Sequence, residues 1–193
     1  TPGIDFMTTS SSGNWKKEID TALEDAMSLS MNTVIVDTRL EDQVIYASSR
    51  LPSVTADFDP LYYLIEQARE EGLYVYAKVG VLWAAQGDKL THYTSVQSSV
   101  LDDIRKEFRS FAENYPVDGI LLDDYYLEST TASYLLYRDS GMSGGVENYL
   151  LGSTEAAIQA ALRGIRSGSK STQAGLLTAS VWANEDEIES GSE

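Results

Sequence analysis

The sequence has 193 residues and a mass of 21.2 kDa, which fits a single domain. It holds 30 acidic and 14 basic residues, and this net charge of −16 argues against nucleic acid and anionic membrane surfaces as partners. No apolar run reaches the roughly 20 residues of a membrane span, which argues against membrane insertion. The absence of cysteine excludes disulfides and a cysteine nucleophile, and a single histidine, His92, argues against a multi-histidine metal centre. The groups left for binding or catalysis are carboxylates, hydroxyls, amides and aromatic rings, which suit sugars.

The first half of the chain has the pattern of two strand–helix units. The apolar run Ile4–Thr8 predicts a first strand, and Trp15–Leu29 has apolar side chains at helical spacing. The β-rich residues within Asn32–Tyr46 predict the second strand. A second helix begins at Asp59–Pro60, with the aspartate as N-cap and the proline in the first helical position, and it ends at Gly72.

The second half continues the alternation. Leu73–Trp83 is a nearly continuous apolar strand, and Ser99–Asn114 has helical spacing. Val117–Leu127 predicts the fourth strand, and a long loop separates it from a helix at Ser153–Ser167. Ala174–Trp182 predicts the fifth strand. We expect one domain over residues 1–183 and a frayed acidic tail over residues 184–193.

Alternating strands and helices, with strands apolar on both faces, predict an α/β fold with a parallel sheet covered by helices. One possibility is an open doubly wound sheet, although no glycine-rich phosphate loop follows any strand. The other is a (β/α) TIM-like barrel, which typically needs about 250 residues. This chain would then hold about five β/α units, and further chain or a partner would complete the barrel.

Ligands of both architectures bind at the carboxyl ends of the strands, and polar or aromatic residues gather at these ends. The candidates are Asp37 and Arg39 after the second strand, Lys78, Trp83 and Gln86 after the third, Asp123, Asp124, Tyr125, Tyr126 and Glu128 after the fourth, and Trp182 and Asn184 after the fifth.

The adjacent pair Asp123 and Asp124 is the sharpest feature. Two carboxylates at the end of a buried strand are costly unless they are paired or used. Strand alternation puts Asp123 on one face with Leu121 and Tyr125, toward the barrel mouth, and Asp124 on the other, in a supporting role such as holding Arg39. The simpler alternative is that both carboxylates cap the following loop.

The other candidates each have a structural alternative. Arg39 would tune Asp37 or Asp123, or it forms a structural ion pair. Together the aromatic residues favour a groove with stacking platforms for sugar rings, although core or rim packing is the better explanation of any one of them; they are Tyr46, Trp83, Tyr125, Tyr126 and Trp182. We expect His92, within a polar stretch, to be an exposed loop residue.

Four segments resemble one family. Asp118–Tyr126 (DGILLDDYY) resembles the DGIHFDDYF-type segment of glycoside-hydrolase-like family 10, a group of bacterial TIM-like barrels. Phe58–Leu73 resembles its second helix, and Asn32–Ser48 its second strand, with Arg39, Tyr46 and Ser48 at matching positions. Ser180–Asn184 is a looser match to a fifth-strand segment.

The resemblance implies a barrel that cleaves or binds bacterial polysaccharide, such as glycan strands containing N-acetylglucosamine. It implies a catalytic acid at Asp123 or Asp124, with Arg39 in the site. The chain departs from the family where Asp37 replaces an amide and where Gly80–Val81 replaces an Asn-Pro pair.

Three functions therefore compete. The first is a glycoside hydrolase with Asp123 or Asp124 as acid and Asp37 or Glu128 as partner, acting on a bacterial or dietary polysaccharide without a cofactor. The second is a non-catalytic glycan-binding barrel domain or a fragment of an enzyme, with Tyr126, Trp182 and Asn184 among the residues contacting the sugar. The third and weakest is a Mg²⁺ or Ca²⁺ enzyme using Asp37, Asp123 and Asp124. Lack of cysteine and an acidic surface suit an extracellular or cell-envelope protein of a bacterium.

Overall fold

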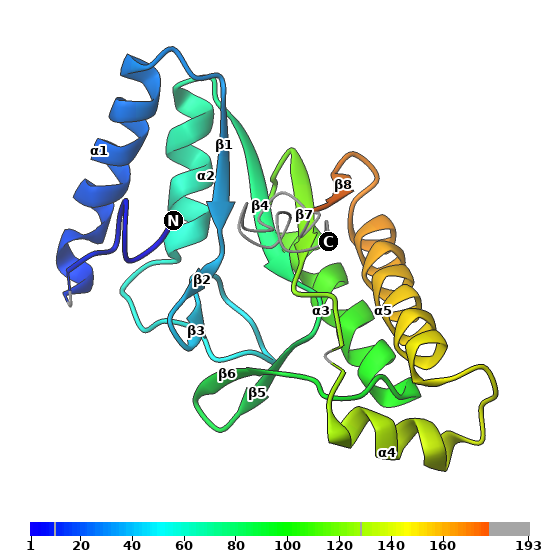
Figure 1. Ribbon diagram of the computed structural model, residues 1–193. Helices are drawn as coiled ribbons and strands as arrows, with labels where there is room; N and C mark the ends of the chain where they lie inside the picture. The colour runs from blue at the N-terminus through cyan, green and yellow to red at the C-terminus, as the bar shows by residue number, and fades with distance from the viewer. Residues whose placement is uncertain (10, 128, 178–193) are drawn as a thin grey trace, which may run out of the picture.

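The computed structural model describes residues 1–9, 11–127 and 129–177. Its centre is a parallel sheet of four strands, β1 (Thr33–Asp37), β4 (Tyr74–Gly80), β7 (Gly119–Asp123) and β8 (Gln173–Leu176). They lie side by side in the order β1-β4-β7-β8 (Figure 1). All neighbouring pairs are parallel, so their carboxyl ends meet at one edge of the sheet.

Helices connect the strands, and two small hairpins lie below the carboxyl edge in Figure 1. The helices are η1 (Ser12–Asn14), α1 (Trp15–Ser28), α2 (Pro60–Glu70), α3 (Ser98–Asn114), α4 (Thr131–Ser140) and α5 (Val146–Gly168). The hairpins are β2 (Arg39–Leu40) with β3 (Gln43–Val44) and β5 (Trp83–Gln86) with β6 (Lys89–His92).

Helix α2 begins and ends as its sequence predicts. The Asp59 carboxylate accepts a hydrogen bond of 2.9 Å from the backbone N–H of Tyr62, which caps the first turn. Gly72 has φ +76°, the left-handed conformation that ends a helix without steric cost. The helix thereby returns the chain to the sheet as β4.

The sheet is buried on one face only. Val75, Ala77 and Val79 of β4 are buried and belong to one core with the apolar faces of the helices. On the opposite face, Ile35 and Tyr74 are exposed by 60% and 57%. Alternate residues of a strand therefore meet different environments.

The strand order distinguishes the two architectures that the sequence left open. A doubly wound sheet reverses its strand order at a switch point and carries helices on both faces. Here the four strands follow one another in chain order, and the helices pack against one face. This is the arrangement of one wall of a TIM-like barrel, and the described strands form an open sheet.

The predicted first strand, Ile4–Thr8, is wrong. The N–H of Gly3 donates to the carbonyl of Phe6 at 2.7 Å, and the Thr1 ammonium lies 2.5 Å from the Asp5 carboxylate, so these residues form a tight turn. Met7 has φ +54°, which is incompatible with an extended strand. Phe6 and Met7 are nevertheless buried, because apolar residues pack in the core without joining the sheet.

Three other boundaries differ from the prediction. The apolar run Leu73–Trp83 divides, since β4 ends at Gly80 and Trp83 already belongs to a hairpin. The predicted long loop contains α4 and the first turns of α5. Strand β8 covers only the start of Ala174–Trp182. The rest of that segment from residue 178, and the predicted tail, lie outside the described residues.

Candidate functional site

Three charged side chains meet at the carboxyl edge of the sheet. In the register, Asp37 lies beside Lys78, and Asp123 lies beside Gly80, two residues further along β4. The ammonium of Lys78 lies 2.8 Å from Oδ2 of Asp37 and 3.0 Å from Oδ2 of Asp123. Two of the three aspartates that the sequence selected, Asp37 and Asp123, are therefore brought together by a lysine between them.

Lys78 is held in its charged form. Partial burial lowers the pKa of Lys78, but hydrogen bonds to Asp37 and Asp123 outweigh it, so that the pKa is raised above the ordinary value. Asp37 uses its second oxygen as well, since Oδ1 accepts from the backbone N–H of Arg39 at 3.1 Å. The group of three carries one net negative charge, and Asp123 keeps Oδ1 without a hydrogen bond to any described residue.

Asp124 has different surroundings from its neighbour. Its φ of +44° is rare for a residue with a side chain, and it ends the alternation of β7. Its Oδ2 accepts a hydrogen bond of 2.7 Å from Nε1 of Trp83 and lies 3.3 Å from Nε2 of His92. The strained conformation thus places the carboxylate against the β5–β6 hairpin.

The hairpin is fastened to the end of β7 by its backbone too. The N–H groups of Val81 and Leu82 donate to the carbonyls of Asp123 and Asp124 at 2.8 and 3.1 Å. Trp83 and His92 are cross-strand partners in this hairpin, which explains why both reach the same carboxylate.

A cavity of about 490 Å³ opens beside this carboxylate. It is lined by Thr91, His92, Tyr93, Thr94, Asp124, Tyr126, Leu127 and Thr130. Tyr126 is 54% exposed, so its ring can be covered by a ligand, while hydroxyls and a carboxylate offer hydrogen bonds. A pocket with an aromatic surface and several polar groups suits a polar, ring-shaped molecule such as a sugar.

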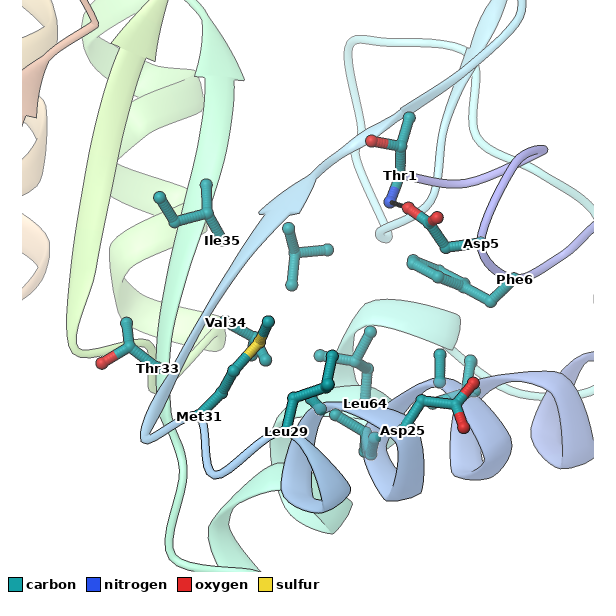
Figure 2. Close-up of a pocket in the computed structure, with 15 residues that line it drawn as sticks. Thr1, Asp5, Phe6, Asp25, Leu29, Met31, Thr33, Val34, Ile35 and Leu64 are labelled. Carbon is teal, nitrogen blue, oxygen red and sulfur yellow. Dashed lines mark hydrogen bonds and ion pairs between the residues drawn. The ribbon is translucent and has the colours of Figure 1, made fainter.

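A second cavity of about 480 Å³ lies between α1 and the open edge of β1 (Figure 2). Figure 2 shows Leu29, Met31, Val34 and Leu64 around it, with Asp5 already paired with Thr1. Most of the residues that line this cavity are aliphatic or aromatic, and none of them is Asp37, Asp123 or Asp124. The cavity is therefore a poorer candidate for polar chemistry than the cavity beside Asp124.

Two predicted sugar platforms are wrong because their rings are buried. Tyr46 is 2% exposed and its hydroxyl donates to Oε1 of Glu107 at 3.1 Å. Trp83 is 1% exposed, so its ring supports Asp124 from the core instead of receiving a sugar.

Tyr125 and Arg39 are also used by the fold. Tyr125 is 5% exposed, and its hydroxyl donates to the carbonyl of Leu177 at 2.9 Å. Burial and the hydrogen bond to Tyr126 raise the pKa of Tyr125 to about 12. Nε of Arg39 donates to the carbonyl of Glu41 at 2.7 Å, and among the described residues Arg39 forms no ion pair with Asp37, Asp123 or Asp124. Its predicted role toward these carboxylates is therefore wrong.

The remaining candidates divide into exposed and undescribed residues. Tyr126 is exposed and lines the cavity, and its role toward a sugar stays a prediction. Glu128, Trp182 and Asn184 lie outside the described residues. No group of three or more histidine, aspartate or glutamate side chains in the described ranges is arranged to hold a metal ion, and no helix there could cross a membrane.

Sequence reasoning assigned no role to Lys78 and expected only exposure for His92. Lys78 had a usable signal, because a lysine inside an apolar strand needs a partner and stands two residues before Gly80 at the strand end. His92 is indeed exposed, but it belongs to β6 and contacts Asp124. No local pattern reveals that contact, since 32 residues separate the two.

Comparison with protein-family models and with curated proteins finds no match. Solved structures do resemble the chain. The α-L-fucosidase isoenzyme 2 from Paenibacillus thiaminolyticus is 15% identical with a TM-score of 0.63, over 91% of this chain and 30% of the fucosidase. The PgaB (BpsB) glycoside hydrolase domain from Bordetella bronchiseptica is 14% identical with a TM-score of 0.59, over 90% of this chain and 62% of that one. A hypothetical protein from Ruminiclostridium thermocellum is 10% identical with a TM-score of 0.54, over 83% of this chain and 90% of that one.

The chain has a glycoside-hydrolase-like fold. At 15% identity or less, the likeness establishes the fold alone, and it does not single out glycoside-hydrolase-like family 10. The chain spans less than a third of the fucosidase and less than two thirds of the PgaB domain structure.

Proposed function

We propose that this chain is part of a glycoside hydrolase that binds and cleaves a polysaccharide at the carboxyl edge of its sheet. The observation that carries the proposal is the meeting of Asp37, Lys78 and Asp123 at the carboxyl edge of the sheet, where Asp124, the next residue of the chain, lines the cavity of about 490 Å³. Active sites of TIM-like barrels lie at this edge. Hydrolysis of a glycosidic bond needs a proton donor and a group that stabilises positive charge at the sugar carbon, and these carboxylates supply both.

The substrate we propose is a glycan of bacterial or dietary origin that contains glucosamine or N-acetylglucosamine. The similarity in fold to the PgaB glycoside hydrolase domain and the resemblance carried by Asp118–Tyr126 support a polysaccharide substrate. The exposed ring of Tyr126 would stack on one sugar, and threonine hydroxyls of the cavity would bind sugar hydroxyls. We also propose that further strands complete the barrel and that the protein acts outside the bacterial cell or in its envelope.

A non-catalytic glycan-binding domain is the second candidate. Lys78 already neutralises part of the charge of Asp37 and Asp123, and the chain spans only part of the enzymes it resembles. Such a domain would retain glycans in its cavity and leave them intact.

One experiment separates these proposals. Wild-type protein and an Asp123→Asn, Asp124→Asn double variant are incubated with glucosamine polymers, acetylated and deacetylated, and with peptidoglycan glycan strands, and released reducing ends are measured. Cleavage by the wild type that the double variant loses supports the hydrolase. Retention without cleavage supports the binding domain, and neither cleavage nor retention contradicts both.

A further inference from the structure

A buried ion pair connects helix α3 to the loop that follows β3. Glu107 of α3 is 6% exposed, and its Oε2 lies 3.5 Å from Nε of Arg50. A buried carboxylate is costly unless polar and charged groups surround it. The hydroxyls of Tyr46 and Ser48 supply two further partners, at 3.1 and 2.9 Å from Oε1. Glu107 is therefore a fixed anchor for the arginine.

The loop holds Arg50 from its backbone as well. Oγ of Ser48 accepts hydrogen bonds from the N–H groups of Arg50 and Leu51 at 3.1 and 2.9 Å. The hydroxyl that binds Glu107 thus also closes the turn that carries Arg50. The position of the guanidinium is determined by α3 and by its own loop together.

From this position Arg50 contacts the β5–β6 hairpin at two points. Its Nη1 donates to the carbonyl of Trp83 at 3.0 Å and to the hydroxyl of Tyr93 at 3.3 Å, and the guanidinium lies over the Tyr93 ring, 5.8 Å from the centroid. The N–H of Tyr93 donates to the carbonyl of Leu82, so the alternation of an antiparallel pair turns the Trp83 carbonyl out of the hairpin. Arg50 supplies the donor that this carbonyl lacks within the hairpin.

Both points of contact lead to the cavity of about 490 Å³. Tyr93 is one of its lining residues, and the Tyr93 hydroxyl also donates to Asp103 of α3 at 3.1 Å. Trp83 donates its 2.7 Å hydrogen bond to Asp124, another lining residue. A shift of the guanidinium would therefore move one lining residue directly and a second through the indole.

We infer that Arg50 is a positioning residue for this cavity. Anchored by Glu107, it sets the places of Tyr93 and Trp83 and thereby the affinity of the cavity for a glycan. The inference rests on the proposed function for its ligand. It applies equally to a hydrolase and to a glycan-binding domain, because it concerns the shape of the cavity and assigns no step of the reaction.

Arg50→Lys tests the inference. Lysine keeps a positive charge beside Glu107, but its single ammonium lacks the planar fork that contacts Glu107, the hairpin carbonyl and the tyrosine together. Arg69→Lys is the matched control, because Arg69 also donates to a backbone carbonyl, that of Pro116 at 2.6 Å, and so ties α2 to the segment after α3.

The first measurement needs no ligand. The indole N–H signal of Trp83 is recorded by ¹⁵N–¹H nuclear magnetic resonance and identified by its absence in Trp83→Phe. We expect Arg50→Lys to shift this signal, because the hydrogen bond from the indole to Asp124 changes when the Trp83 backbone is released. Arg69→Lys should leave the signal in place.

The second measurement is calorimetric titration with the tetramers of glucosamine and of N-acetylglucosamine. For the tetramer that the wild type binds, we expect Kd to rise about three- to thirtyfold in Arg50→Lys and to stay unchanged in Arg69→Lys. A purely structural arginine would lower the urea midpoint of Arg50→Lys and leave both Kd and the indole signal as they are.

Tyr93→Phe keeps the inference testable if Arg50→Lys does not fold. It retains the ring and removes the hydroxyl that contacts Arg50 and Asp103. Its control is Tyr63→Phe, which removes a hydroxyl that donates to Asp20 at 2.9 Å between α1 and α2. We expect Kd to rise about two- to fivefold in Tyr93→Phe alone, and equal affinities of the two variants would overturn the inference.

The outcomes are distinct. A shifted indole signal together with a raised Kd in Arg50→Lys, neither seen in Arg69→Lys, supports the inference. A change in one without the other overturns it, because both must change if Arg50 acts through the hairpin, and so does a change in neither. A wild type that binds neither tetramer overturns the proposed function and the glycan as ligand, and the indole signal then still decides whether Arg50 positions the hairpin.

Discussion

Trp83 and Asp124 are joined by a 2.7 Å hydrogen bond from the indole to the carboxylate, so a core residue sets the position of a site residue. The indole fits beside β4 because residue 80 is a glycine. A Cβ at Gly80 would lie 2.2 Å from the Trp83 ring, which no real contact permits. The packing of the core at Gly80 therefore also determines the position of the Asp124 carboxylate.

Gly80→Ala should displace Trp83 from Asp124. We expect the free energy of unfolding to fall by about 1–3 kcal/mol, because overpacking a dense core forces side chains from their positions. Urea unfolding measures this loss, and near-ultraviolet circular dichroism reports the changed indole environment. Gly152→Ala is the control, since nothing lies within 4 Å of its added Cβ in helix α5, and its stability should rise or stay unchanged. Equal stabilities of the two variants would contradict the close packing at Gly80.

Lys78→Met should leave Asp37 and Asp123 facing each other without a cation. At pH 7 we expect a loss of about 1–3 kcal/mol in the free energy of unfolding, because two partly buried carboxylates lose their charged partner. The loss should shrink in acid, where protonated carboxyl groups no longer repel. Urea unfolding of wild type and variant across acid pH measures it. Lys89→Met, which breaks the exposed 3.4 Å pair with Asp42, should cost under about 0.5 kcal/mol. A loss no larger than that in Lys78→Met would contradict the role of Lys78.

Alkaline pH should destabilise the protein through its buried tyrosines. Burial and a hydrogen bond to Asp59 raise the pKa of Tyr115, and burial and Glu107 raise that of Tyr46. Because the pKa is raised in the folded state, each neutral tyrosine contributes its full stabilisation below about pH 10, where the tyrosine of the unfolded chain titrates. This stabilisation is lost as the pH rises further. The pKa of Lys78 is also raised in the folded state, so its contribution to stability is likewise lost at alkaline pH.

Tyr115→Phe tests this dependence. Between pH 10 and 11, each tyrosine of this kind lowers the free energy of unfolding by up to about 1.4 kcal/mol. The free energy of unfolding of Tyr115→Phe should therefore fall by about 1 kcal/mol less than that of the wild type over this interval. Urea unfolding at pH 8, 10 and 11 gives the comparison. Tyr62→Phe, at an exposed position, should follow the wild-type curve. Parallel curves for wild type and Tyr115→Phe would rule out this source of alkaline instability.

Tyr126→Ala should weaken glycan binding, whereas Tyr46→Phe should not. Tyr126 presents an exposed ring to the cavity. Losing a stacking interaction worth about 0.5–1.5 kcal/mol of binding free energy corresponds to roughly a two- to twelvefold rise in Kd. Tyr46 lies in the core, so its variant should lose stability and keep its affinity. Calorimetric titration with the glycan that the protein retains measures both. Unchanged affinity in Tyr126→Ala would contradict a stacking role for Tyr126.

The sequence predicted the periodic parts of the fold well. Apolar spacing and caps located α1, α2 and α3 to within about a residue at most ends, because each depends on neighbours in the chain. Ile4–Thr8 failed because an apolar run is compatible with a strand and equally with a buried turn. The prediction of one continuous strand over Leu73–Trp83 failed because the strand is ended by distant residues. The carbonyl groups of Asp123 and Asp124 accept hydrogen bonds from Val81 and Leu82.

The sequence identified the carboxylates Asp37, Asp123 and Asp124 but not the side chains that contact them in the structure. Carboxylates at strand ends are visible in the sequence, since they interrupt apolar runs at Asp37 and Asp123. Strict alternation does not predict the position of the Asp124 side chain, because its left-handed φ turns it out of the strand. Its contact with His92 depends on a hairpin that docks through tertiary contacts, which periodicity does not reveal.

The most direct test of the carbohydrate site is a crystal structure of the protein with a bound oligosaccharide, either glucosamine or N-acetylglucosamine tetramer. The account predicts sugar rings in the cavity lined by His92, Asp124 and Tyr126, with a sugar oxygen within hydrogen-bond distance of Oδ1 of Asp124. Sugar bound in the cavity between α1 and β1, with the carboxyl edge of the sheet unoccupied, would contradict it.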